Sequence, residues 1–204
     1  MQLEAKNISF QYTKKGNKIL NNVNLVIKEG ERVGLIGPSG YGKSTLGKVL
    51  SGYEIPDTGE VLLDGKPLPL KGVCPVQLIY QHPEESINPR WKMRQVLEES
   101  NQPSEEEMEK LGIEREWLTR YPRELSGGEL QRFSVARALS KSTRFLIADE
   151  ISTMLDAITA AQLWNYILEE SNVCNMGLIV ITHNMELAKR VCTRVIDLRD
   201  INQI

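Results

Sequence analysis

The sequence has few of the features that mark secreted, disulfide-stapled or membrane-spanning proteins. It contains three cysteines, Cys74, Cys174 and Cys192, which lie far apart and form no C-x-x-C pair. Neither a disulfide framework nor a zinc site is therefore indicated. The first ten residues, MQLEAKNISF, lack a basic segment followed by an apolar core, and no apolar run approaches the roughly 18 residues of a membrane span. We expect a soluble protein in a reducing, cytosolic compartment.

The chain also lacks an excess of charge of either sign. Its 25 Lys and Arg residues stand against 27 Asp and Glu residues, which gives a net charge of −2. Such a balance provides no electrostatic drive toward nucleic acid or an anionic membrane, so we expect no nucleic-acid partner. The length of 204 residues predicts a single domain, 1–204, that carries a smaller subdomain.

Short apolar segments alternate with longer helical patterns along the chain. Core strands are predicted at residues 33–36, 77–80, 145–148 and 178–182, and this alternation is typical of an α/β fold with a mainly parallel sheet. The segments before residue 33, and GEVLLDGKPL after it, predict an N-terminal antiparallel β subdomain. Residues 83–121 are rich in Glu and predict a helical insertion, within a small helical subdomain of approximately 83–140. The acidic run at 105–109 predicts a solvated helix face.

A glycine-rich octet, GPSGYGKS, follows the predicted strand at 33–36. It matches G-x-x-x-x-G-K-[ST], the phosphate-binding loop, in which glycines let backbone N–H groups approach an anion at a helix N-terminus. Lys43 could reach the β and γ phosphates, and the Ser44 hydroxyl could hold Mg²⁺. An ordinary glycine-rich turn is the alternative for this segment taken alone.

The segment RFLIADE predicts a buried strand that ends in two carboxylates. Ligand chemistry in an open α/β sheet lies at such strand ends. Asp149 would complete the magnesium shell, and Glu150 would polarise a water for attack on the γ phosphate. Acidic residues also occur in solvated turns, so the assignment depends on the phosphate loop that precedes them.

A second glycine-containing segment, LSGGELQRFSVARAL, predicts an amphipathic helix with Ser126 as its N-cap. Gly127 and Gly128 would expose backbone N–H groups there, as in a second phosphate-binding device. One γ phosphate does not need two cradles in one subunit, so we expect this one to face the nucleotide of another subunit. A capped helix after a Gly-Gly turn is the plainer alternative.

Together these motifs resemble those of the nucleotide-binding subunit of ATP-binding-cassette (ABC) transporters, over essentially the whole chain. GPSGYGKST resembles the Walker A loop, LSGGE the signature motif, LIADE the Walker B strand and TMLD, residues 153–156, the D-loop. Gln81 resembles the Q-loop glutamine, and His183 in VITHN resembles the switch histidine. The order and spacing of the set are far more specific than any one motif.

The resemblance implies a P-loop NTPase fold and an ATPase that binds ATP and Mg²⁺. Gln81 would couple the γ phosphate and Mg²⁺ to a membrane partner, and His183 would bond the γ phosphate; by themselves these would be a surface glutamine and a structural histidine. Tyr12 would stack on adenine, against the alternative of a simple strand tyrosine. The residues implied to bind nucleotide are Tyr12, Ser39, Gly40, Gly42, Lys43, Ser44, Thr45, Ser126, Gly127, Gly128 and Asp156. Those implied in catalysis are Glu150, His183 and Gln81, and those at the metal are Ser44, Gln81 and Asp149.

Three positions depart from the family's pattern. Tyr41 occupies a loop position that is usually small, Glu129 replaces the commoner glutamine of the signature, and Ile151 stands where proline is frequent. None of these changes removes a catalytic group.

QHPEESINPRW and RYPRELSGGELQR resemble the peptide and nickel importer branch of the family. The resemblance implies a peripheral subunit at the cytoplasmic face of the membrane that powers import of peptides, nickel or metal chelates. Its partners would be permease subunits, a second ATPase subunit, identical or homologous, and indirectly a solute-binding protein. A non-transport ATPase of the same superfamily is the alternative, although the chain has neither coiled-coil insertions nor a second cassette.

Overall fold

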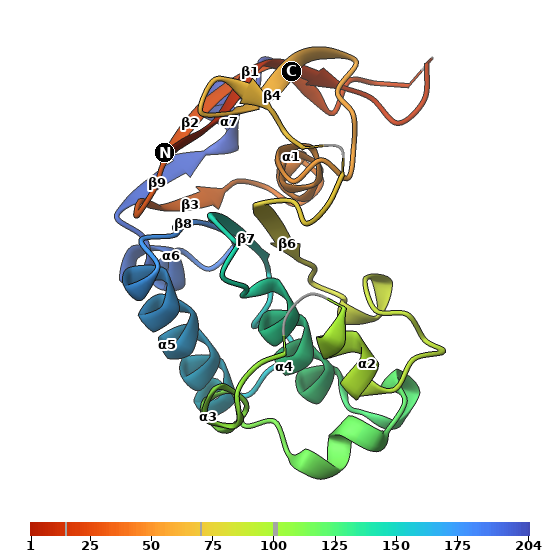
Figure 1. Cartoon of the computed structure of the whole chain (residues 1–204). Coiled ribbons are helices and arrows are strands. Elements are labelled where there is room, and N and C mark those ends of the chain that lie inside the picture. The colour runs from red at the N-terminus through yellow and green to blue at the C-terminus, as the bar shows by residue number, and fades with distance from the viewer. Residues whose placement is uncertain (15, 70, 100–101) are drawn as a thin grey trace.

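The fold combines an antiparallel and a parallel sheet (Figure 1). The computed structural model describes residues 1–14, 16–69, 71–99 and 102–204. Within these residues, the antiparallel sheet has the order β2-β1-β4-β5 and the parallel sheet the order β6-β7-β8-β3-β9. The antiparallel strands are β1 (Gln2–Phe10), β2 (Leu20–Lys28), β4 (Thr58–Leu63) and β5 (Lys66–Pro67). The parallel strands are β3 (Arg32–Ile36), β6 (Val76–Ile79), β7 (Phe145–Asp149), β8 (Gly177–Ile181) and β9 (Arg194–Asp197).

The parallel sheet is covered on both faces, as its apolar strands require. Side chains alternate along each strand, so Phe145 and Ile147 of β7 join one buried cluster while Leu146 and Ala148 join another. The first cluster contains residues of the antiparallel sheet and of α1 (Lys43–Leu50). Helix α1 therefore lies between the two sheets (Figure 1).

The close approach of α1 to the parallel sheet depends on a glycine. A Cβ atom on Gly47 would lie 3.0 Å from Cδ1 of Ile181 and 3.4 Å from Cγ2 of Ile147. The first distance is shorter than an ordinary van der Waals contact, and the second is at its lower limit. The absence of a side chain at Gly47 thus allows α1, which follows the phosphate loop, to pack directly against β7 and β8.

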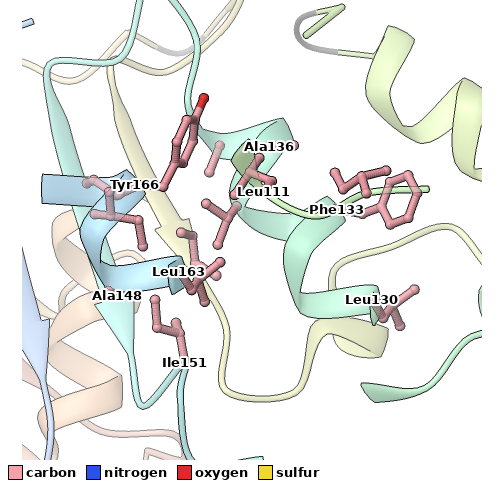
Figure 2. Close-up of a cluster of buried hydrophobic side chains, with 14 of the residues drawn as sticks. Leu111, Leu130, Phe133, Ala136, Ala148, Ile151, Leu163 and Tyr166 are labelled. Carbon is pink, nitrogen blue, oxygen red and sulfur yellow. The ribbon is translucent and has the colours of Figure 1, made fainter. Parts of the chain in front are cut away.

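The other face of the parallel sheet packs against helices. They include α4 (Gly127–Ala138), α5 (Ala157–Val173) and α6 (Met185–Val191). Figure 2 shows part of their core, where Leu163 and Tyr166 of α5 lie near Ala148 of β7 and Leu130 and Phe133 project from α4. Apolar burial on this scale, at about 25 cal/mol per Å², is the main force that holds the helices to the sheet.

The segment that precedes α4 consists of short helices. These are α2 (Met93–Glu98) and α3 (Glu105–Lys110), with 3₁₀ turns at Pro83–Glu85, Arg115–Thr119 and Pro122–Glu124. The predicted insertion includes residues 100–101, which lie outside the described residues. None of the residues of α3 is buried, in agreement with a solvated acidic helix. A further short helix, α7 (Leu198–Ile201), follows β9.

The predicted fold class is confirmed. The four predicted core strands correspond to β3, β6, β7 and β8, and the strands before and after β3 form the antiparallel sheet. Strand β9 was not among the predicted core strands, and it extends the sheet on the far side of β3. Helices of the described residues are all too short or too polar to cross a membrane.

Candidate functional site

The predicted site residues follow adjacent strands of the parallel sheet. Strands β6, β7, β8 and β3 are neighbours in that order and run in parallel. Their carboxyl ends therefore meet at one edge of the sheet, where open α/β sheets place ligands. Gln81 follows β6, Glu150 follows β7, His183 follows β8 and the phosphate loop follows β3.

A cavity of about 570 Å³ lies at this edge. Its lining brings together residues from most of the predicted motifs. They are Tyr12, Ser39, Gly40, Gly42, Lys43, Ser44, Thr45, Gln81, Glu150 and His183, joined by Ile19. Ile19 belongs to no motif and was not predicted; the apolar pair that it forms with Leu20, the first residue of β2, is the only signal that could have indicated it.

The phosphate loop has the backbone shape of an anion cradle. Gly40 and Gly42 have φ values of 76° and 98°, in the left-handed region where glycine is favoured. Lys43 opens α1 and is buried, and its Nζ donates to the carbonyls of Gly37 and Pro38, each at 2.9 Å. The free N–H groups of a helix N-terminus and a fixed ammonium group are thus placed at one point of the cavity.

Asp149 is the buried carboxylate behind this loop. Its Oδ1 has no hydrogen-bond partner among the described residues. Burial raises the pKa of Asp149, and the nearby charge of Glu150 adds to this effect, while a hydrogen bond from Ser44 and the charge of Lys43 oppose it. A desolvated carboxylate oxygen without a partner is suited to a cation.

The donor set fits Mg²⁺. The Asp149 carboxylate lies beside the Ser44 hydroxyl, and Gln81 lines the same cavity. Among the described residues, no group of three or more His, Cys, Asp or Glu side chains could hold a metal by itself. This is expected of Mg²⁺ in phosphoryl-transfer sites, which takes few protein ligands and keeps its waters and the substrate phosphates.

Glu150 is held in a strained conformation at the mouth of the cavity. Its φ is 49°, a value that non-glycine residues rarely adopt. Its N–H donates to Ile181 O at 3.0 Å, and its carbonyl accepts from Thr153 Oγ1 at 3.0 Å. Its Oε1 lies 3.1 Å from His183 Nδ1. The two backbone bonds hold the main chain of Glu150, and His183 orients its carboxylate, as a general base requires.

Tyr12 forms an exposed wall of the same cavity. Its ring packs edge-on against Phe10, with the centroids 4.9 Å apart, and its hydroxyl lies 3.1 Å from Thr45 Oγ1 in α1. The residue is 56 % exposed. A face of this ring is therefore open to stack against a planar ligand.

The remaining predicted residues line a different cavity. Its volume is about 490 Å³, and within the described part of the chain it shares no lining residue with the first. The predicted residues in its lining are Ser126, Gly127, Gly128 and Asp156. Trp117, Arg132, Met154 and Leu155 line it as well. Met154 and Leu155 belong to the predicted D-loop and Arg132 follows the signature motif, whereas no sequence motif marked Trp117.

The N-terminus of α4 forms one side of this second cavity. Ser126 Oγ accepts from Glu129 N at 3.3 Å, and Glu129 Oε2 accepts from Ser126 N at 2.6 Å, which is a capping box. Asp156 caps α5, since its Oδ1 accepts from Ile158 N and Thr159 N, each at 3.0 Å. The backbone hydrogen bond from Thr159 lowers the pKa of Asp156. Two helix N-termini therefore face one cavity.

The three departures from the family's pattern have local explanations. Tyr41 is half-buried and packs against the core cluster of the two sheets. Ile151 is buried beside Leu163 (Figure 2), where it fills apolar space. Glu129 completes the capping box of Ser126, a role that glutamine can also perform.

Comparison with known proteins agrees with this architecture. A family model described as "ABC transporter" matches residues 20–153. The nickel import system ATP-binding protein NikE of Staphylococcus aureus (strain bovine RF122 / ET3-1) is 36 % identical over 213 residues, covering 97 % of this chain and 87 % of the relative. The relative from strain N315 is 35 % identical over 212 residues, with the same coverage.

Solved structures show the same similarity. The dimeric structure of MJ0796, a bacterial ABC transporter cassette, has a TM-score of 0.81 at 25 % identity, covering 96 % of this chain and 93 % of that one. A post-hydrolysis dimer of the same cassette, bound to ADP and Pi, has a TM-score of 0.80 with the same identity and coverage.

Proposed function

Since this chain belongs to the ABC transporter family and is an ATP-hydrolysing subunit of that family, we propose that it powers an importer of nickel, free or chelated. The observation that carries the proposal is the 36 % identity to nickel import ATP-binding proteins along 97 % of the chain. The residues 81–91, which resemble the peptide and nickel importer branch, support the same choice. Peptides are the second cargo class of that branch and are distinguished by experiment below.

ATP binds in the first cavity in this proposal. Its triphosphate lies along the phosphate loop, where Ser39, Gly40, Gly42 and the N-terminus of α1 supply N–H groups and Lys43 supplies charge. Thr45 and the ring of Tyr12 hold the remainder of the nucleotide. Ser44, Gln81 and Asp149 would hold Mg²⁺, which when bound would supply charge neutralisation for the transferring phosphoryl group. The unpartnered Oδ1 of Asp149 supports this placement.

Hydrolysis depends on Glu150 and His183. Glu150 accepts a proton from the attacking water, and its fixed direction supports this role because its backbone and its carboxylate are both held. His183, 3.1 Å from the carboxylate, orients it and can donate a hydrogen bond to the γ phosphate. Positioning and charge stabilisation are the main contributions that proteins make to phosphoryl transfer.

Two subunits complete each catalytic site. Ser126, Gly127, Gly128 and Asp156 line a cavity separate from the phosphate loop of their own chain, which supports their acting on the nucleotide of a second, identical or homologous subunit. ATP then lies between the phosphate loop of one subunit and the second cavity of the other. Its hydrolysis removes the γ phosphate that both subunits contact.

Transport is coupled through Gln81 and the helical segment that follows it. Gln131 of α4 is buried, and its Nε2 donates to the carbonyl of Tyr80 at 3.4 Å, one residue before Gln81. A displacement of Gln81 can therefore be transmitted to α4, the helix that carries the signature glycines. The helical subdomain, approximately 83–140, docks under permease subunits at the cytoplasmic face of the membrane, and a solute-binding protein delivers the cargo to them.

Uptake into vesicles tests this proposal. Vesicles that hold the permease, its solute-binding protein and both ATPase subunits should accumulate nickel only with MgATP, and Glu150→Gln in this chain should remove most of the uptake. Gln81→Ala should leave ATP binding largely intact and uncouple hydrolysis from uptake. If peptide-loaded binding protein stimulates hydrolysis and nickel does not, the cargo is peptide. If uptake does not depend on this chain, the importer assignment is wrong.

A further inference from the structure

The segment that follows β9 packs behind the phosphate loop, although none of its residues lines the cavity. β9 pairs with β3, so its carboxyl end lies at the edge of the sheet that carries the loop. A Cβ atom on Gly37 would lie 3.5 Å from Asp197 Oδ1 and 3.6 Å from Leu198 Cβ. The loop thus has the cavity on one side and this segment on another.

Asn202 connects this segment to two walls of the cavity. The residue is 3 % exposed, and both its amide oxygen and its amide nitrogen are hydrogen-bonded. Oδ1 accepts from Asn21 N at 2.8 Å, while Nδ2 donates to Ile19 O at 3.0 Å and, at the long limit of 3.5 Å, to Tyr41 O. Tyr41 belongs to the phosphate loop, and Ile19 lines the cavity. One buried side chain therefore joins the loop to the start of β2.

Through Ile19, Asn202 is also connected to Tyr12, the aromatic wall of the cavity. Ile19 N donates to Phe10 O at 2.9 Å, and the ring of Phe10 supports the ring of Tyr12. The Ile19 carbonyl that accepts from Asn202 also packs closely against the phosphate loop, because a Cβ atom on Gly42 would be 2.9 Å from Ile19 O. A shift of Ile19 would accordingly move the Tyr12 side of the cavity relative to the start of α1.

We propose that Asn202 is a positioning residue that holds the wall formed by Tyr12 and Ile19 against the phosphate loop. Its effect is on binding of the adenosine part of the nucleotide, because a wall held in place before binding needs no ordering when the base arrives. The triphosphate is bound by the phosphate loop, Lys43 and the N-terminus of α1. Among the described residues, Asn202 contacts these only through its long 3.5 Å bond to Tyr41 O, whereas its bond to Ile19 O is 3.0 Å. The inference rests on the proposed binding of ATP in this cavity.

Equilibrium titration of the full chain with two ligands tests the proposal. MgATP carries the adenosine part, and inorganic tripolyphosphate lacks it. Asn202→Ala removes all three hydrogen bonds, and the isosteric Asn202→Asp removes both donors while keeping the acceptor for Asn21 N. Both variants should raise the Kd of MgATP about ten-fold, the effect expected from one to two hydrogen bonds, and leave the Kd of tripolyphosphate unchanged.

Gln203→Ala is the matched control. It lies in the same segment, and its Oε1 accepts from Asn22 Nδ2 at 3.1 Å, but its side chain does not line the cavity. This variant should bind both ligands as the parent chain does. Equal weakening of MgATP and tripolyphosphate by the Asn202 variants would give Asn202 a general structural role, and unchanged affinity for MgATP would give it none; either result overturns the proposal.

Hydrogen exchange in the unsubstituted chain gives a test that does not depend on the variants folding. The amide of Asn21 is bonded to Asn202 Oδ1. By linkage, MgATP should slow its exchange more than tripolyphosphate does at equal saturation. Equal protection by the two ligands would contradict the proposal. Failure of the unsubstituted chain to bind either ligand would instead contradict the proposed function of the cavity.

Discussion

Two serine caps with nearly the same geometry separate structural from functional effects in this protein. Ser126 Oγ accepts from Glu129 N at 3.3 Å, and Glu129 Oε2 accepts from Ser126 N at 2.6 Å. In α3, Ser104 Oγ accepts from Glu107 N at 3.2 Å, and Glu107 Oε2 accepts from Ser104 N at 2.5 Å. Only Ser126 lines the second cavity. Replacing each serine by alanine therefore removes equivalent caps in two different settings.

The expected loss of stability is small and similar in both variants. A serine cap contributes about 0.5–2 kcal/mol, and accepted hydrogen bonds longer than 3 Å place both caps in the lower half of that range. For a domain of this size, about 1 kcal/mol lowers the melting temperature by roughly 2–4 °C. Thermal unfolding should therefore show similar decreases in melting temperature for Ser126→Ala and Ser104→Ala.

Association in MgATP should differ between the two variants. If Ser126 bonds the γ phosphate of the other subunit, its loss removes a charged hydrogen bond, worth about 1.5–3 kcal/mol, at each of two sites. The dimer of Ser126→Ala should then be weakened by about a hundred-fold or more, while Ser104→Ala associates as the parent does.

Sedimentation equilibrium measures this difference in a Glu150→Gln background, which slows turnover, with and without MgATP. If the natural partner is a second subunit, the same variants are compared in the mixed pair. Equal association of the two variants with MgATP would refute the assignment of Ser126 to the nucleotide of the opposite subunit.

Three further predictions concern charge and packing around the site. Glu129→Gln preserves the capping box and removes a charge beside the second cavity, so it should tighten MgATP-dependent association several-fold at low salt and not at high salt. Glu124→Gln, in another capping box, is the control. An effect of Glu129→Gln that does not depend on salt would contradict the reasoning. Burial raises the pKa of Asp149 in the folded chain, so the protonated carboxyl stabilises the fold below the unfolded pKa of about 4, and this contribution is lost as the pH rises through the raised folded pKa. Asp149→Asn should therefore have a higher melting temperature than the parent at pH 7 and the same melting temperature near pH 3. A lower melting temperature of Asp149→Asn at pH 7 would contradict this reasoning. Gly47→Ala gains about 1 kcal/mol of helix propensity but crowds Ile181 at a cost of about 1–3 kcal/mol. Denaturant titration should therefore show a net loss of stability. A more stable variant would show that α1 can shift away from the sheet.

Much of the fold could be predicted because its parallel strands are short apolar runs. Phe145 to Ala148 are all buried, and a strand covered on both faces shows as a continuous apolar segment. β9 lacked this signal, since Arg194 and Val195 are exposed and the strand is at the edge of the sheet. Its pairing with β3 is a property of the topology that no local pattern contains.

The phosphate-loop and strand-end residues could also be named from the sequence, because their chemistry follows from residue type and spacing. The position of Ile19 could not, since it reaches the cavity through a packing contact with Gly42. Nor could the backbone strain at Glu150, or the hydrogen bonds of Asn202, which join residues more than 160 positions apart. Such features depend on where distant segments meet after folding.

Binding and turnover of MgATP in Lys43→Ala and Glu150→Gln, with the assembled transporter present, test the proposed catalytic site most directly. Lys43→Ala should weaken MgATP binding, because the loop loses its fixed ammonium group. Glu150→Gln should bind MgATP as tightly as the parent and hydrolyse it at least a hundred-fold more slowly, within the usual contribution of a general base. Hydrolysis by Glu150→Gln at the parental rate would contradict the role of Glu150 as the base and the catalytic site described here.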